Sequence, residues 1–191
     1  DQELVPIAGT TYPVEEKSII KELEELSQKY DWDGAKKRAV ADTWKNQYMV
    51  NLPPAQEHKE WLIDPTIRVT QDVKDKQGRV IASAGELINP LARFPQNLTM
   101  IIFDPMNPGQ LEWAEKQYRQ RLGSGQVMPM FTRIKQENGW DHLNDLREKF
   151  NGKVFKVNEQ IIARFQIKNT PALISTEKEK FRITQFSEAE I

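Results

Sequence analysis

The sequence predicts an α/β fold in which two parallel strands flank one helix. Residues 98–103 form a short apolar run rich in β-branched side chains, which is typical of a strand buried on both faces. Two prolines and a glycine in residues 104–109 predict a turn. Over residues 110–123 apolar side chains recur every three or four positions, which predicts a helix, and residues 127–133 supply a second strand. This order favours parallel pairing and a right-handed connection.

Further elements are predicted beyond this βαβ unit. Apolar side chains spaced along residues 140–150 predict a second helix, and residues 153–157 and 159–165 suit a short strand and a short helix. Residues 172–174 and 180–184 are predicted to be antiparallel strands joined by a charged turn. The main order is therefore strand, helix, strand, helix, a short helix and two final strands.

That order resembles a thioredoxin-like domain. In such domains a Thr-Pro or Val-Pro step before the third strand usually carries a cis peptide bond, so the resemblance implies a cis bond between Thr170 and Pro171. The redox site of the fold lies at the turn that opens its first helix. Here residues 105–108 read Pro-Met-Asn-Pro and offer no thiol. The resemblance therefore implies a thioredoxin-like C-terminal domain without redox activity.

A small antiparallel β unit is predicted before this domain. Residues 66–73 alternate apolar and polar side chains, a loop containing Gly78 follows, and residues 79–82 return as a strand. Residues 86–88 extend again before an Asn-Pro step. These features predict a short hairpin segment with proline at its ends.

The N-terminal residues are predicted to be helical. An amphipathic stripe starts after Pro13, and a second helix is predicted over about residues 35–49, before paired prolines. We therefore expect three parts: a helical N-terminal arm over residues 1–58, a β-hairpin segment packed on the C-terminal domain over residues 59–95, and the thioredoxin-like domain over residues 96–191.

Composition excludes several classes of function. The chain has 191 residues, a formal net charge of -1 and no cysteine. The lack of cysteine excludes disulfides, thiol catalysis, cysteine-based zinc sites and iron–sulfur clusters. The charge balance argues against a nucleic-acid partner, and no apolar run reaches the roughly 18 residues of a membrane helix, so no direct membrane insertion is expected. Because the sequence starts at Asp1 without a leader, we expect that a signal peptide was removed or the sequence was trimmed.

No catalytic set is evident. The two histidines, His58 and His142, lack a second ligand at metal-binding spacing and are predicted to be surface residues. Ser124 lies between glycines but outside the pattern of a nucleophile elbow. Four aspartates could supply a catalytic pair of carboxylates: Asp64, Asp72, Asp75 and Asp104. The sequence does not determine the distances between them. We therefore predict no catalytic residue, no cofactor and no metal.

Two specific motifs occur in the chain, Asp-Pro-Thr-Ile at residues 64–67 and Gly-x-x-x-Asn-Pro-Leu at residues 85–91. Further stretches accompany them, in chain order Tyr12-Pro13-Val14-Glu15-Glu16, Trp61-Leu62-Ile63, Asp72, Gly78-Arg79-Val80, Asp104-Pro105, Gln110, Trp113, Arg164-Phe165-Gln166-Ile167 and Pro171-Ala172. In this order and spacing, over nearly the whole chain, they resemble the TraW family of F-type conjugative transfer systems.

The resemblance implies an exported, periplasmic protein that helps to assemble the conjugative pilus within a type IV secretion apparatus. It also implies action together with other periplasmic assembly proteins, of the TraU and TrbC types. No catalytic activity, cofactor or metal is implied.

We therefore interpret the chain as a binding and assembly protein. Candidates for partner contact have side chains that suit an interface and lie in predicted loops or at helix edges: Tyr12, Pro13, Trp61, Asp64, Pro65, Asn89, Pro90, Gln110 and Trp113. The apolar stripe of the first predicted helix adds Ile19, Leu23 and Leu26. A structural role is an equal alternative for each, since Asp64, for example, suits the capping of a turn.

Two enzyme classes are the alternatives. A thiol–disulfide oxidoreductase suits the fold but not a chain without cysteine. A periplasmic carbohydrate-active enzyme that modifies peptidoglycan would need two carboxylates facing each other in a cleft.

Overall fold

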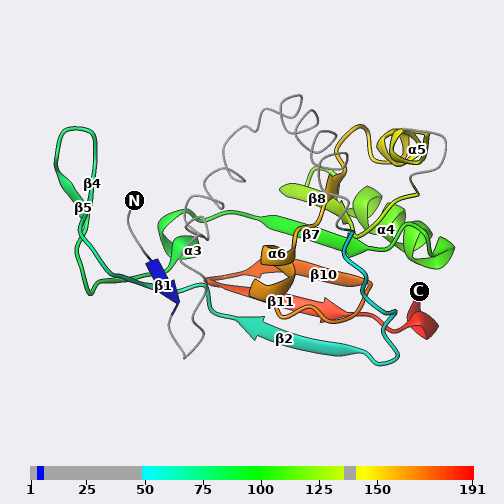
Figure 1. Cartoon of the computed structure of the whole chain (residues 1–191), viewed down its shortest axis with the longest axis horizontal. Helices are drawn as coiled ribbons and strands as arrows, with labels where there is room; N and C mark the ends of the chain where they lie inside the picture. The colour runs from blue at the N-terminus through cyan, green and yellow to red at the C-terminus, as the bar shows by residue number, and fades with distance from the viewer. Residues whose placement is uncertain (1–3, 7–48, 136–140) are drawn as a thin grey trace. The chain divides into compact units, whose positions relative to one another are not determined.

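The computed structural model describes residues 4–6, 49–135 and 141–191 (Figure 1). The described residues form two compact units. Unit 1 contains residues 4–6, Ile63–Gln96 and Thr176–Phe181, and unit 2 contains residues 49–62, 97–175 with a gap at 136–140, and Arg182–Ile191. The helices predicted between residues 13 and 48 lie outside the described residues. The predicted three-part division into residues 1–58, 59–95 and 96–191 stays a prediction.

A six-stranded sheet is the centre of unit 2. Strands β7 and β8 are parallel, β8 and β9 are parallel, and β10 is antiparallel to β7. The strands, in their order across the sheet, are β2 (Lys59–Ile63), β11 (Lys180–Gln185), β10 (Ala172–Glu177), β7 (Leu98–Phe103), β8 (Gln126–Phe131) and β9 (Phe155–Lys156). Three helices connect them: α4 (Pro108–Arg121), α5 (Asp141–Lys149) and α6 (Glu159–Arg164).

This topology is that of a thioredoxin-like domain, so the predicted fold class is confirmed. The βαβ unit β7–α4–β8 is followed by β10, which returns beside β7 in the antiparallel direction, and then by β11. Phe103, Val127 and Leu173 lie on three adjacent strands and belong to one core cluster. The structure also contains the edge strand β2, which sequence analysis did not predict.

The central strand β7 is buried along its whole length. All six of its residues are buried, because β8 and β10 pair with its two edges and helix α4 packs against it. Core aromatic side chains gather on this sheet, with the Phe150 ring 5.4 Å from the rings of both Phe103 and Tyr118. The continuous apolar sequence of β7 follows from this double-sided burial.

The two parallel strands β7 and β8 start at one tight contact. The Asn97 carbonyl accepts a hydrogen bond from the Gln126 N–H at 2.9 Å, and the Asn97 side-chain amide donates to the Ser124 carbonyl. Gly125 has a φ of +108°, and a Cβ there would lie 2.5 Å from the Asn97 carbonyl oxygen. Only glycine therefore fits between the end of α4 and the start of β8.

Unit 1 contains two small sheets. The first has the order β1-β3-β6 and the second pairs β4 with β5. The strands are β1 (Leu4–Pro6), β3 (Ile67–Val69), β4 (Val73–Lys74), β5 (Val80–Ala82) and β6 (Leu87–Ile88). The predicted strand over residues 66–73 is thus divided into β3 and β4. The division occurs where the Asp72 side chain accepts a hydrogen bond from the Ala84 N–H at 2.8 Å, in place of a backbone ladder.

A short helix, α3 (Pro90–Arg93), closes this unit and was not predicted. Asn89 caps it, because its Oδ1 accepts hydrogen bonds from the N–H groups of Leu91 and Ala92 at 2.9 and 3.4 Å. No helix in the part of the chain that the structure describes combines the length and apolarity needed to cross a bilayer.

Candidate functional site

The position expected for a redox site lies between the end of β7 and the start of α4. Asn107 begins this helix, since its Oδ1 accepts hydrogen bonds from the N–H groups of Gly109 and Gln110 at 3.1 and 3.3 Å. Pro108 follows at the first helical position. Its fixed φ suits the helix there, and the backbone N–H that proline lacks would have no acceptor within the helix. The helix therefore starts two residues earlier than Gln110, the predicted first residue.

Gln110 joins three segments at this end of the sheet. Its side chain is 1% exposed. The Gln110 Oε1 accepts a hydrogen bond from the Asp104 N–H at 2.8 Å, and its Nε2 donates to the Thr170 carbonyl at 3.4 Å. Both ends of the amide are thus bound inside the protein. Gln110 was a candidate for partner contact, and the structure places it where it holds the end of β7 against the loop before β10.

Asp104 forms the charged part of this site. Its Oδ2 lies 2.8 Å from Arg133 Nη2 and 3.0 Å from Arg133 Nε, and its Oδ1 accepts a hydrogen bond from the Met106 N–H at 3.0 Å. The hydrogen bond to Asp104 raises the pKa of Arg133 above its ordinary value. Both carboxylate oxygens of Asp104 therefore already have partners within the protein.

The chain's own residues also occupy the backbone groups next to Pro171. The Thr170–Pro171 peptide bond is cis. The Thr170 N–H donates to the Pro53 carbonyl at 3.2 Å, and the Thr170 carbonyl accepts from the Ala55 N–H at 2.8 Å. Residues 49–55 thus lie across the end of this sheet as an extended segment, held as well by a hydrogen bond from the Val50 N–H to the Thr132 carbonyl at 3.1 Å.

His142 is a second ionisable residue of unit 2. Its Nδ1 lies 2.7 Å from the Lys135 backbone nitrogen and accepts a hydrogen bond from that N–H. Burial, and then the charge of Lys135, lowers the pKa of His142, whereas the charges of Asp145 and Asp104 act in the opposite direction. The lowered pKa keeps the ring neutral, as its acceptor role requires. The prediction of a surface residue therefore fits this partly buried histidine only in part.

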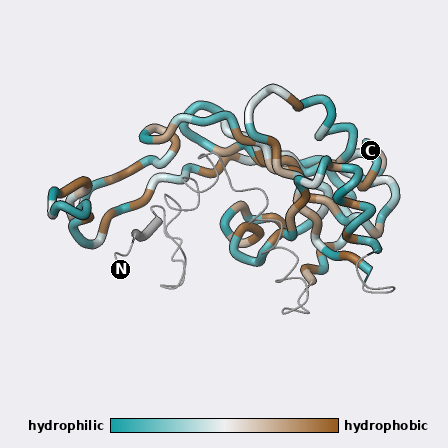
Figure 2. Tube along the Cα trace, turned by 90° about the horizontal axis from the view of Figure 1, so that it is seen from above, coloured by the Kyte–Doolittle hydropathy of each residue, from teal (hydrophilic) through white to brown (hydrophobic). Residues whose placement is uncertain are grey.

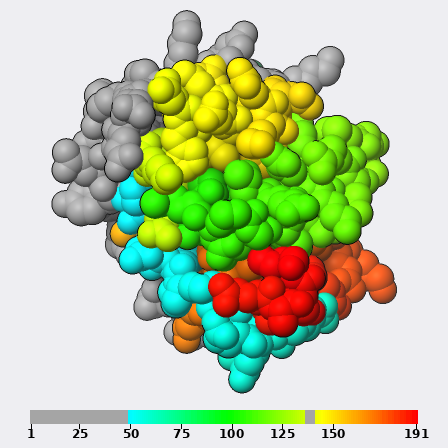
Figure 3. Space-filling view, turned by 90° about the vertical axis from the view of Figure 1, so that its right-hand side faces the viewer, coloured from blue at the N-terminus to red at the C-terminus, as the bar shows by residue number. Residues whose placement is uncertain are grey.

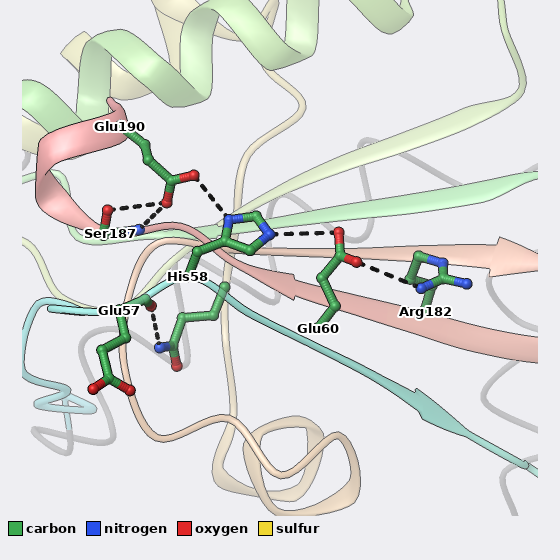
Figure 4. Close-up of polar contacts among 7 residues, drawn as sticks. Glu57, His58, Glu60, Arg182, Ser187 and Glu190 are labelled. Atoms are coloured by element: carbon green, nitrogen blue, oxygen red, sulfur yellow. Dashed lines mark hydrogen bonds and ion pairs between the residues drawn. The ribbon is translucent and has the colours of Figure 1, made fainter.

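A separate polar cluster fixes the short 3-10 helix η1 (Glu188–Glu190) to the start of β2 (Figures 3 and 4). His58 Nδ1 lies 2.9 Å from Glu190 Oε1, and His58 Nε2 lies 3.5 Å from Glu60 Oε1. The Glu190 carboxylate also accepts hydrogen bonds from the N–H and hydroxyl of Ser187, and the backbone N–H is the main reason that the pKa of Glu190 is lowered. His58, Glu60 and Glu190 are exposed, whereas Ser187 is buried, so the cluster suits fastening of the C-terminal segment better than catalysis.

The predicted contact residues do not converge on one site. Tyr12, Pro13, Ile19, Leu23 and Leu26 lie outside the described residues. The other seven are divided between the two units: Asp64, Pro65, Asn89 and Pro90 in unit 1, and Trp61, Gln110 and Trp113 in unit 2.

Several of these side chains make internal contacts. Trp61 Nε1 donates to the Phe165 carbonyl at 2.9 Å, and the buried Trp113 ring lies 5.3 Å from the Phe186 ring. Asp64 Oδ1 accepts a hydrogen bond from the Thr66 N–H at 2.9 Å, as expected of a residue that caps a turn. Asn89 Nδ2 donates to the Glu179 carbonyl at 2.8 Å. A role in partner contact stays a prediction for all seven.

The four aspartates that could supply a carboxylate pair are divided between the two units. Asp104 belongs to unit 2, whereas Asp64, Asp72 and Asp75 belong to unit 1, where each accepts hydrogen bonds from nearby backbone N–H groups. Within the described ranges, no group of three histidine or acidic residues is arranged to hold a metal ion. The sequence could have revealed Asn107-Pro108 as a helix start, but nothing in it pairs Asp104 with Arg133.

Taken together, the fold and this site define a thioredoxin-like domain that lacks a thiol where redox chemistry would occur. No known family profile matches the chain. Protein TraW of Escherichia coli K12 is 24% identical over 176 residues, which cover 87% of this chain and 79% of that protein. This similarity along most of the chain confirms the predicted resemblance to the TraW family.

Solved structures with some similarity are more distant. One is a secreted disulfide oxidoreductase of Mycobacterium tuberculosis, homologous to E. coli DsbE, with 14% identity and a TM-score of 0.38 over 56% of this chain and 84% of that one. Another is a protein of the thioredoxin-like superfamily, with 12% identity and a TM-score of 0.35 over 73% of this chain and 86% of that one.

Proposed function

We propose that this protein is a non-enzymatic, periplasmic assembly protein of an F-type conjugative type IV secretion system. In this role it is needed for assembly of the pilus and binds other periplasmic transfer proteins, of the TraU and TrbC types. Similarity to TraW along most of the chain supports the place in conjugation.

One observation carries the non-enzymatic part of the proposal. At the turn before α4, the position of the redox site in this fold, the side chains are already committed to internal partners. Asp104 is bound by Arg133, Gln110 is bound at both ends of its amide, and the Thr170 backbone is bound by residues 53–55. A site held in this way, in a chain without cysteine, suits a rigid scaffold better than thiol exchange.

Complementation tests the role in conjugation. A donor strain that lacks the gene is supplied with the protein carrying an export signal, and both transfer frequency and extended pili are counted. Both should return to the level of the unmodified donor. Export without restored transfer would contradict the proposal.

Two activity assays test the absence of enzymatic function. The purified protein should not accelerate insulin reduction by dithiothreitol, and it should not release soluble fragments from peptidoglycan. A disulfide oxidoreductase and a lysozyme serve as positive controls. Turnover in either assay, retained after removal of contaminants by a second purification step, would contradict a scaffold role.

A further inference from the structure

Two neighbouring aliphatic side chains of unit 1 are exposed although they lie in a strand. Val80 and Ile81 of β5 are 51% and 53% exposed. β5 pairs with β4 in a two-stranded sheet, in which Val73 is opposite Ala82 and Lys74 is opposite Val80. Ile81 is therefore an extra residue on one strand, a bulge that redirects side chains and is common next to functional sites. Hydrophobic and hydrophilic residues lie close together along this hairpin, residues 73–82, at the left end of Figure 2.

The tip of the hairpin is held rigidly. Asp75 Oδ1 accepts hydrogen bonds from the N–H groups of Gln77 and Arg79, both at 2.9 Å, and its Oδ2 lies 2.7 Å from Arg79 Nε. The Gly78 N–H donates to the Asp75 carbonyl at 3.0 Å, with Gly78 at a φ of +80°. Because the tip is already ordered, binding through the hairpin would lose little conformational entropy.

The base of the hairpin is fixed as well. Ala82 is buried, and the guanidinium of Arg93 donates to the Ile81 carbonyl at 3.2 Å. At the bulge of β5 the Ile81 carbonyl therefore already has a hydrogen-bond partner, so a further strand could not pair with β5 in register there. A partner that approaches this side of β5 would have to recognise its side chains instead of extending its sheet.

Charge adds a second requirement for the partner. The hairpin contains Lys74, Lys76 and Arg79 against one carboxylate, Asp75, which gives +2 in a chain whose net charge is -1. Since Arg79 forms an ion pair with Asp75, the two exposed lysines supply the uncompensated charge. Both lysines precede the aliphatic pair in the sequence, and Lys74 is directly opposite Val80 across the hairpin.

We infer that the hairpin of residues 73–82 is a docking surface for a protein partner with an apolar depression bordered by carboxylates. This inference rests on the proposed function, since the partner is another protein of the transfer apparatus. An anionic membrane would match the lysines alone and not the aliphatic pair. The hairpin has no aromatic side chain to enter the interface, so a protein partner fits it better.

Substitutions in the full-length chain test the inference. Val80→Asp and Ile81→Asp place a carboxylate in the aliphatic patch, where it would face the acidic border of the partner. Leu122→Asp is the matched control, because Leu122 is 50% exposed but lies at the end of α4 in unit 2. Affinity for purified TraU-type and TrbC-type proteins is measured by isothermal titration, and thermal melting verifies that each variant is folded.

The expected result is binding of the unmodified chain to one of these proteins, with affinity about tenfold weaker for Val80→Asp and Ile81→Asp and unchanged for Leu122→Asp. The double variant Lys74→Glu, Lys76→Glu should also bind more weakly, with the difference shrinking at high salt. Equal affinity of all folded variants would overturn the inference and leave the proposed function standing. Binding to phosphatidylglycerol vesicles that Val80→Asp abolishes would overturn it in favour of a membrane. If the unmodified chain binds neither protein, the result contradicts both this inference and the proposed binding of TraU-type and TrbC-type proteins.

Discussion

Arg133 Nη2 lies 2.8 Å from Asp104 Oδ2, although the two residues are 29 positions apart in the sequence. Each follows the end of a parallel strand, β7 for Asp104 and β8 for Arg133, and these strands are paired along their whole length. The ion pair therefore closes the carboxyl end of the sheet. Its aspartate side chain is 8% exposed and its arginine side chain 36% exposed, so the pair is neither fully buried nor a surface contact.

We expect Arg133→Ala to lower the free energy of unfolding by about 2 kcal/mol, between the values for surface and buried pairs, because the Asp104 carboxylate would lose its cation. Urea denaturation followed by tryptophan fluorescence measures the change. Arg79→Ala is the control, since it breaks the exposed ion pair with Asp75 and should lower the free energy of unfolding much less. Equal effects of the two substitutions would mean that the Asp104 site has no special importance for stability.

Gln110→Leu should destabilise the protein by about 2 kcal/mol, because the buried N–H of Asp104 would lose its acceptor. The same substitution at Gln120 of α4, an exposed position, should change stability by less than about 0.5 kcal/mol. Chemical denaturation of both variants gives the comparison. If Gln110→Leu keeps full stability but loses partner binding, Gln110 would be assigned to partner contact, as the sequence predicts, and not to stabilising the fold.

Stability should decrease as the pH falls below neutrality because of His142. Burial lowers the pKa of this histidine below its ordinary value of 6.5. The unfolded chain therefore takes up a proton near pH 6.5 while the folded protein keeps the ring neutral, so the stabilisation is complete above pH 6.5 and is lost as the pH falls toward the folded pKa.

Urea midpoints at pH 7.5 and pH 5.5 measure this dependence, and His142→Gln should reduce it while keeping an acceptor for the Lys135 N–H. At pH 5.5 the carboxylates of Asp75 and Glu190, whose pKa values are lowered, remain charged and do not contribute. A pH dependence that is the same in the variant would assign the effect to another group.

Leu23→Asp should abolish binding to TraU-type or TrbC-type proteins without changing the melting temperature, if the apolar stripe of Ile19, Leu23 and Leu26 contacts a partner. Lys21→Asp, on the opposite side of the predicted helix, is the control and should bind normally. Pull-down and thermal melting of the full chain give the two readings. A lower melting temperature of Leu23→Asp alone would show that the stripe is part of the protein's own core.

The sequence predicts the centre of the fold well because burial there leaves a simple pattern. β7 was predicted with the bounds that the structure has, since both of its faces need apolar side chains. β2 was missed because Lys59–Ile63 is an edge strand whose residues are all at least partly exposed, so no apolar alternation marks it. α3 was missed because a four-residue helix is too short for periodicity, although Asn89-Pro90 is a helix-start signal.

The sequence predicts where the candidate site lies in the fold, but not which residues contact one another in it. The turn before α4 follows from the two prolines, but the partners of Asp104 and Gln110 come from residues 29 and 60 positions away. Such contacts depend on strand register, which a single sequence does not specify at this distance. Trp113 and Gln110 were interpreted as possible contact residues for the same reason: their burial is decided by the elements that pack over them.

Gly125 determines more than its own turn. By letting the chain pass within contact distance of Asn97, it sets Leu98 level with Gln126, and five positions later Phe103 is level with Phe131. A strand of six residues spans roughly 20 Å. The alignment that brings Asp104 beside Arg133 at one end of the sheet therefore depends on the absence of a side chain at Gly125, at the other end. A side chain at this remote position would misplace the Asp104–Arg133 pair without touching either residue.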